Sequence, residues 1–302
     1  MKQNDFKLPI FFLILAFLWG SSFVVIKFAI HSFDSWFSAA ARLAVAFLAL
    51  SIFAIIKKER LRVNLSLGVK VWVTGLFTLG IPFALLFWGE KYISAGLAGM
   101  ANGTTPLWTS LLAFFMISHE RKLLQKPASL FGLFLGLVGI VLLFLPIIQA
   151  KDFHQIEGAL AVLGMAICYA VGNVFNRVLF SKHEQISIVA SSFHQHLASF
   201  ILLALGWLMF GEVPESLGFT ENLEAWLAIF YLAIFSTSIA LGLFFKLVKT
   251  WGAVKTSSVT YVVPVFAVFL DFLVFGNQPA FMSLIGIAVI FGGIYFIRTA
   301  KA

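Results

Sequence analysis

Long runs of apolar residues alternate along the chain with short polar connections. Apolar runs lie near residues 8–29, 34–56, 69–89, 94–117, 128–148, 157–178, 186–210, 224–246, 253–275 and 280–297. A membrane-spanning helix needs about 20 mostly apolar residues, so the pattern predicts ten spans. The first run continues past Lys2 and Lys7 without a small-residue cleavage site, so we interpret it as a retained helix. The predicted fold class is an all-α integral membrane protein.

Composition supports this class. Hydrophobic residues make up 61% of the 302 positions and charged residues 11%, whereas soluble domains have about 45–50% and about 25%. A soluble globular, disordered or nucleic-acid-binding protein is therefore excluded, despite the net charge of +8. The longest connections, near 57–68 and 211–223, leave no room for a separate catalytic domain. The single cysteine, Cys168, excludes an internal disulfide, and we expect neither metal nor cofactor.

The lysines and arginines predict the orientation. With the N-terminus in the cytoplasm, 17 of the 21 fall on the cytoplasmic side, and only Lys27, Lys91 and Lys151 fall outside. The remaining one, Arg42, lies within the second span. Short cytoplasmic loops carry the excess of positive charge, so both termini are predicted to be cytoplasmic in a multi-pass protein of the cytoplasmic (inner) membrane.

The two halves of the chain resemble each other. The segment 19–27 aligns with 169–177 at an offset of 150, Arg42 with His196 at 154, and Pro106 with Pro264 at 158. The matches indicate two five-helix repeats, over 1–150 and 151–302. Five spans is an odd number, so the second copy enters from the opposite side. Inverted repeats are typical of secondary transporters, although a duplicated structural bundle is the alternative.

These residues resemble the EamA-like branch of the drug/metabolite transporter superfamily. The resemblance rests on Trp19-Gly20-Ser21-Ser22 with Lys27, Arg42, Ala95-Gly96 before Pro106, His119-Glu120-Arg121, Trp251-Gly252-Ala253, Pro264, Gly286 and Gly292-Gly293. It covers essentially the whole chain. It implies a ten-helix fold and the movement of metabolites, often amino-acid export. One departure is Gly276-Asn277, where the family has a Gly-Glu pair.

Prolines are the first candidates for function. Pro82, Pro106 and Pro264 are predicted to interrupt spans three, four and nine. A proline removes a helix hydrogen bond, and broken helices paired near the membrane midplane are typical of transporter binding sites. Pro106 and Pro264 are paired by the repeat, so we expect helix breaks that gate the site. Simple packing kinks are the alternative.

Polar faces of the spans predict a substrate site at the same depth. Ala98, Asn102, Thr105, Pro106 and Thr109 would share one face of span four. The predicted substrate-binding residues are Trp19, Ser22, Asn102, Thr105, Tyr169, Asn173 and Tyr261. Loss of the Asn102 or Tyr261 side chain is expected to reduce transport. Hydrogen bonding between helices is the structural alternative.

Only two charged residues lie well inside the predicted spans, Arg42 and Asp271. Intramembrane ionisable groups are costly and usually functional. The two could pair, or Arg42 could bind a substrate carboxylate; a structural role for Arg42 is slightly favoured. Asp271 could instead reach the outer interface. Lys27 and Glu90 end their spans, and we expect them to be solvated.

Further side chains are interpreted as structural. His194 and His196 face different ways on a helix, so we expect buried, hydrogen-bonded histidines rather than a metal site. Gly132, Gly136 and Gly139, matched in span ten, predict close packing of spans five and ten, either with each other or at a homodimer seam.

The sequence thus predicts a secondary transporter that moves a small neutral or zwitterionic, amino-acid-like metabolite by alternating access, with export favoured. Uptake or exchange of a nucleoside-like or cationic metabolite is the alternative. A lipid-processing membrane enzyme is less favoured, because the acidic loop residues lack companion histidines or lysines: Glu212, Glu215, Glu221 and Glu224. The predicted partners are the substrate and the lipid bilayer, not nucleic acid.

Overall fold

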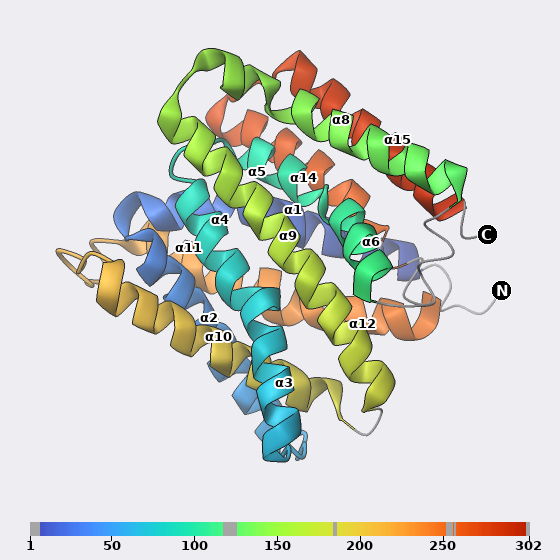
Figure 1. Cartoon of the computed structure of the whole chain (residues 1–302). Helices are drawn as coiled ribbons and strands as arrows, with labels where there is room; N and C mark the ends of the chain where they lie inside the picture. The colour runs from blue at the N-terminus through green and yellow to red at the C-terminus, as the bar shows by residue number, and fades with distance from the viewer. Residues whose placement is uncertain (1–6, 117–125, 184–185, 252–255, 257, 300–302) are drawn as a thin grey trace.

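Helices form the whole of the described architecture (Figure 1). The computed structural model describes residues 7–116, 126–183, 186–251, 256 and 258–299. In the first half the elements are α1 (Lys7–Ser32), α2 (Ser35–Ile56), α3 (Leu65–Gly75), η1 (Leu76–Gly80), α4 (Ile81–Gly89), α5 (Ala95–Asn102), α6 (Thr105–Met116) and α8 (Pro127–Ala150). In the second half they are α9 (Phe153–Lys182), α10 (Ile188–Phe210), α11 (Leu223–Ala233), η2 (Ile234–Ile239), α12 (Ala240–Trp251), α14 (Val259–Phe275) and α15 (Phe281–Thr299).

Polar side chains set where several helices begin. The Asp34 carboxylate accepts hydrogen bonds from the Trp36 and Phe37 amides at the start of α2. Ser94 accepts from the Leu97 amide before α5, and Ser187 accepts from the Ala190 amide before α10. The first amides of a helix have no partner within it, so these caps hold each helix to its starting residue.

Seven helical stretches within the described residues are long and apolar enough to cross a membrane. They are Leu8–Ser32, Ser35–Ile56, Leu65–Gly89, Pro127–Ala150, Phe153–Lys182, Ile188–Phe210 and Leu223–Phe244. The all-helical prediction is confirmed, and seven of the ten predicted spans are found as continuous helices of this length. The fourth predicted span falls on α5 and α6, and the ninth and tenth fall on the shorter apolar stretches Val259–Phe275 and Phe281–Ile297.

The predicted helix breaks are found in part. α5 ends at Asn102 and α6 begins at Thr105, so the chain is interrupted just before Pro106. The polar residues of span four therefore do not share one continuous helix face. The prediction of a break at Pro264 is wrong, because α14 runs through it. Pro264 lies in the second turn of α14, where it removes one helix hydrogen bond, yet the helix runs on to Phe275.

Within the described residues, two wide turns of π-helix interrupt otherwise α-helical spans. η1 lies between α3 and α4, with Pro82 following it, and η2 lies between α11 and α12. They begin at Leu76 and Ile234, which are 158 positions apart, the same offset that relates Pro106 to Pro264. π-Helical turns are rare in proteins overall, but those that do occur are often found at functional sites.

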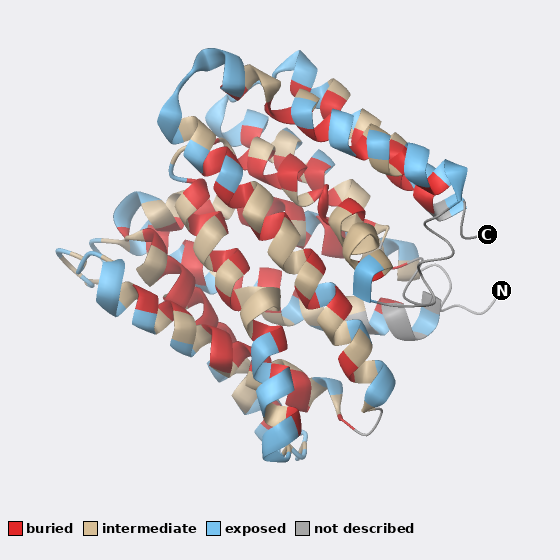
Figure 2. Cartoon of the chain, in the orientation of Figure 1, coloured by how far each residue is buried: buried red, intermediate tan, exposed pale blue. Residues whose placement is uncertain are grey.

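Glycines allow the closest helix contacts. α8 packs on α15 along its length, and a Cβ at Gly139 would lie 2.8 Å from the Gly286 carbonyl oxygen (Figure 1). A Cβ at Gly132 would lie 2.4 Å from the Gly293 carbonyl oxygen. The predicted packing of these two helices is thus found within one chain, whereas the homodimer stays a prediction. The outer face of α8 exposes large apolar side chains, as expected toward lipid (Figure 2).

Candidate functional site

Arg42 is the centre of the candidate site. It lies eight residues into α2 and is only 4% exposed. Its guanidinium carbon lies 4.2 Å from the centroid of the Phe83 ring and 6.0 Å from that of Phe87, both on α4. Nε donates a hydrogen bond to the Thr237 hydroxyl, at 3.2 Å. Within the described part of the chain, Nη1 has no hydrogen-bond partner, so a buried cation keeps donor capacity for a ligand.

The π-helical turn η2 presents Thr237 to Arg42. The Thr237 hydroxyl also donates to the Leu232 carbonyl, five residues back, at 2.8 Å. This bond holds the Thr237 hydroxyl to the preceding turn of the same span, and the hydroxyl oxygen then accepts from Arg42. η1 has a comparable polar contact, since Asn176 of α9 donates to the Thr78 hydroxyl at 3.2 Å. Both π-helical turns therefore carry hydrogen bonds between helices.

Glu90, directly after α4, is fully buried. Neither carboxylate oxygen has a hydrogen-bond partner among the described residues. The half-buried Lys27 at the end of α1 lies beside it, and its ammonium donates to the backbone carbonyls of Glu90 and of Ile93, the latter at 2.6 Å. The prediction that Glu90 is solvated is wrong, because its side chain is fully buried, and Lys27 is only half-exposed, with its ammonium bonded to the turn after α4.

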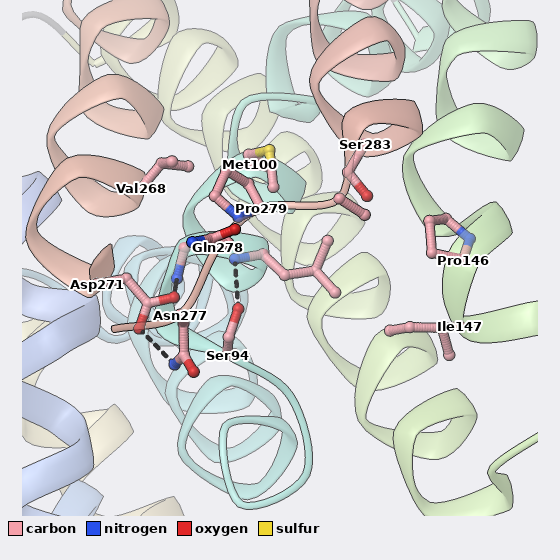
Figure 3. Close-up of a pocket in the computed structure, with 13 residues that line it drawn as sticks. Ser94, Met100, Pro146, Ile147, Val268, Asp271, Asn277, Gln278, Pro279 and Ser283 are labelled. Carbon is pink, nitrogen blue, oxygen red and sulfur yellow. Dashed lines mark hydrogen bonds between the residues drawn. The ribbon is translucent and has the colours of Figure 1, made fainter. Parts of the chain in front are cut away.

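Asp271 is buried at the same end of the bundle and joins two segments. Its carboxylate accepts the Gly96 amide of α5 and the Asn277 side-chain amide, each at 3.0 Å (Figure 3). It therefore satisfies one of the free amides at the N-terminus of α5. The predicted pairing with Arg42 is not found in the described structure, and the prediction that Asp271 reaches the interface is wrong, because it is 2% exposed.

A small pocket opens beside Asp271, between α5, α8, α14 and α15 (Figure 3). Its volume is about 110 Å³, and Ser94, Pro146, Asn277 and Ser283 are among its lining residues. Ligand pockets usually measure about 300–1,000 Å³. Several polar side chains that line this pocket are also already engaged, since Ser283 donates to the Leu143 carbonyl and Asn277 donates to Asp271. We therefore interpret it as packing around the Asp271 contacts.

The effects of Arg42→Ala and Asp271→Ala on thermal stability are expected to be additive. The two side chains have separate hydrogen-bond partners, and substitutions without shared partners usually combine within about 0.5 kcal/mol. The melting temperatures of both single variants and of the double variant, in detergent, check this. Recovery of most of the loss in the double variant would show that the two residues pair after all.

Comparisons with known proteins identify the family. The model of the EamA-like transporter family matches residues 7–145 and 156–299. The chain belongs to this family. It is 26% identical over 93% of its length to a chloroplastic WAT1-related protein of Arabidopsis thaliana, covering 67% of that protein. It is also 26% identical over 94% of its length to a protein of Salmonella typhimurium named "Probable amino-acid metabolite efflux pump", covering 92% of it.

Two further comparisons are consistent with this family assignment. "Protein PagO" of Salmonella typhimurium is 23% identical over 98% of this chain, which covers 94% of PagO. A solved crystal structure has the same fold, with a TM-score of 0.63, 21% identity and 97% coverage of both chains. The protein is thus a multi-pass membrane transporter of the EamA-like family.

The residues predicted to bind substrate have different surroundings in this EamA-like chain. The Ser22 hydroxyl donates to the Trp19 carbonyl at 2.7 Å, and the Trp19 ring lies against Phe244. Tyr169 is half-buried and interacts electrostatically with Arg42. Asn173, one turn further along α9, is exposed, so the prediction that it faces inward is not supported.

The remaining predicted residues lie around the break in span four. Asn102 is half-buried at the end of α5, and Thr105 is buried, with no hydrogen-bond partner for its hydroxyl among the described residues. The Tyr261 ring packs edge-on against Phe291. A Cβ at Gly103 would lie 3.0 Å from Pro264 Cγ. The break before Pro106 therefore packs against Pro264, the residue that the predicted repeat pairs with Pro106. Whether these residues bind substrate stays a prediction.

Several residues of the site were not predicted from sequence. Thr237 and Phe83 contact Arg42, and Glu90 is buried beside Lys27. The spacing of Phe83, Phe87 and Glu90, which puts them on one helix face, is a signal that could have been used. Of the motifs that carry the family resemblance, His119-Glu120-Arg121 and Gly252-Ala253 lie outside the described residues.

His194 and His196 are both hydrogen-bonded, as expected, although only His196 is buried and His194 is half-buried. His194 contacts the Leu61 carbonyl at 2.9 Å, and the Trp72 indole donates to its other nitrogen. His196 is buried and bonds the Ser192 carbonyl at 2.8 Å. Each histidine therefore has a protein partner of its own.

Proposed function

We propose that this EamA-like transporter exports a small, net-neutral, carboxylate-bearing metabolite, such as an amino acid, by alternating access. Arg42 carries the proposal. Its buried guanidinium has an N–H group without a partner among the described residues, and it stacks on Phe83. A guanidinium binds a carboxylate through charge-assisted hydrogen bonds, and the two rings suit an apolar side chain.

The surrounding charges support a net-neutral substrate. Arg42 and Lys27 are basic and Glu90 and Asp271 are acidic, so these four neighbouring side chains are two of each kind. A strongly anionic substrate, such as a sugar phosphate, usually requires several arginines or lysines. The Salmonella typhimurium relative named as an amino-acid metabolite efflux pump supports both the substrate class and the direction.

Two features support alternating access. The family model matches each half of the chain separately, and η1 and η2 begin 158 positions apart, in step with the predicted repeat. We propose that residues 1–150 and 151–302 are inverted repeats, forming ten spans together. The π-helical turns and the break before Pro106 would let parts of a span move relative to each other, as alternating access requires.

Glu90 favours a second candidate, a carrier for a cationic or nucleoside-like metabolite, because a buried carboxylate without a hydrogen-bond partner among the described residues could bind a cation. A thermal-shift panel of amino acids, nucleosides and amines on the purified protein separates the two candidates. We expect amino acids to raise the melting temperature of the wild type, and not that of Arg42→Gln. Stabilisation by nucleosides or amines alone would overturn the proposal in favour of the second candidate.

We also propose that the protein lies in the cytoplasmic membrane with both termini inside, as the charge bias suggests. Single cysteines at Leu65 and Val213, both more than 80% exposed, probe opposite ends of the bundle. In a Cys168→Ser background, an impermeant maleimide added to intact cells is expected to label position 213 and not position 65. Labelling of position 65 alone would reverse the orientation.

A further inference from the structure

Four ionisable side chains, Lys27 of α1, Arg42 of α2, Asp271 of α14 and Glu90 after α4, lie near one another, and two of them are bonded to backbone groups. The Lys27 ammonium donates to the carbonyls of Glu90 and Ile93, closing the turn after α4. The Asp271 carboxylate accepts the Gly96 amide and the Asn277 side chain, one bond to each of its oxygens. These two groups hold backbone segments together, and their role is structural.

The other two charged groups keep unused hydrogen-bonding atoms. Arg42 has one bond, to Thr237, and Nη1 has no partner within the described residues. Both oxygens of Glu90 are likewise without a partner there. The two groups interact electrostatically, yet no Arg42–Glu90 ion pair within 4.0 Å is found in the described structure. Arg42 and Glu90 are therefore neighbours that form no direct ion pair in the described structure.

Arg42 and Glu90 lie near successive positions along α4 and the turn that follows it. Phe83 and Phe87 are four residues apart and share one face of α4, and Glu90, directly after the helix, follows three residues later. The guanidinium carbon of Arg42 lies 4.2 Å from the Phe83 ring and 6.0 Å from the Phe87 ring. Glu90 follows Phe87 by about one turn. The cation, two aromatic rings and the carboxylate therefore succeed one another along α4.

We propose that Glu90 is a specificity-determining residue, which binds the ammonium group of a zwitterion whose carboxylate binds Arg42. The inference rests on the proposed function and adds to it the group that selects for an amine. A zwitterion offers one anion and one cation a short distance apart, and it keeps the local charge balanced. Phe83 and Phe87 would contact its apolar side chain.

The selectivity follows from how many of the two buried, unpartnered groups a ligand can pair. A carboxylic acid that lacks the amine would bind Arg42 and leave Glu90 buried without a partner. An amine that lacks the carboxylate would bind Glu90 and leave Arg42 Nη1 buried without a partner. Sites built to hydrogen-bond one substrate group can reject an analogue without it by about 10⁴-fold. We expect a preference of at least about 100-fold for the zwitterion over either single-charge analogue.

A competition experiment in proteoliposomes tests this inference. Exchange of radiolabelled L-leucine is measured against unlabelled L-leucine, 4-methylpentanoate, which lacks the amine, and 3-methylbutylamine, which lacks the carboxylate. In the wild type only L-leucine should compete well. In Glu90→Gln the affinity for 4-methylpentanoate should approach that for L-leucine, and in Glu90→Asp the wild-type preference should return. Size-exclusion profiles and melting temperatures show whether each variant is folded.

Each outcome bears on one of the two proposals. Leucine exchange with the same zwitterion preference in Glu90→Gln would overturn the role of Glu90 and leave the proposed function standing. If Glu90→Gln does not fold, the wild type alone still tests the role of Glu90. An affinity of the wild type for 4-methylpentanoate or 3-methylbutylamine within threefold of its affinity for L-leucine would overturn that role. Absence of exchange in the wild type, for leucine and for the other standard amino acids, would overturn both proposals.

Discussion

Replacing Arg42 with glutamine is expected to lower transport of an amino acid by at least about 100-fold. The loss of a buried, charge-assisted pair costs about 2–5 kcal/mol, which corresponds to about 30-fold to several thousand-fold in binding. Glutamine keeps a donor toward Thr237, and it removes the charge and the planar group stacked on Phe83. Initial rates of exchange in proteoliposomes, together with melting temperatures, measure the effect.

Arg42→Lys provides the matched control. It keeps the positive charge and loses the forked geometry that a guanidinium presents to a carboxylate, so we expect an intermediate rate. Wild-type exchange in a folded Arg42→Gln protein would mean that Arg42 does not contact the substrate, and that its contacts with Thr237 and Phe83 serve only to pack α2.

The second large effect is expected at Gly286, where α15 crosses α8. A Cβ at this position would lie 2.4 Å from the Leu143 amide nitrogen and 2.7 Å from the Gly139 carbonyl oxygen. Both are backbone atoms of a helix, so they cannot move aside as a flexible side chain would. Overpacking usually costs about 1–3 kcal/mol. We expect Gly286→Ala to lower the melting temperature by roughly 5 °C or more.

Gly292 on the same helix is the control, because a Cβ there has no atom within 4 Å. Gly292→Ala should leave the melting temperature unchanged or raise it slightly, since alanine favours the helix more than glycine does. Equal melting temperatures for Gly286→Ala and Gly292→Ala would contradict the close packing of α8 on α15.

The helices and their closest contacts were predictable from sequence, because both depend on local pattern. A run of apolar residues is enough to predict a spanning helix, and the glycines at 132, 136 and 139 already mark a surface for close approach. The break before Pro106 follows from the missing amide and from the Asn102-Gly103-Thr104 segment. Pro264 has the same chemistry, but it lies early in α14, where the helix tolerates it.

The contacts of the charged residues were not predictable, because they depend on backbone atoms of distant segments. Asp271 is satisfied by the Gly96 amide, and Lys27 is satisfied by two carbonyls in the turn after α4. A comparison of side chains alone suggested instead that Asp271 could pair with Arg42. Thr237 reaches Arg42 from a π-helical turn, which shifts side chains away from the faces that ordinary helical spacing assigns.

The most direct test of the account is trans-stimulation of transport in proteoliposomes. Vesicles that contain the purified protein are loaded with unlabelled L-leucine or with buffer alone, and entry of radiolabelled L-leucine is followed from outside. A carrier that alternates between two states returns faster with substrate bound, so internal leucine should accelerate entry several-fold, and Arg42→Gln should abolish the acceleration. Entry at the same rate from loaded and empty vesicles, unaffected by Arg42→Gln, would contradict alternating access through this site.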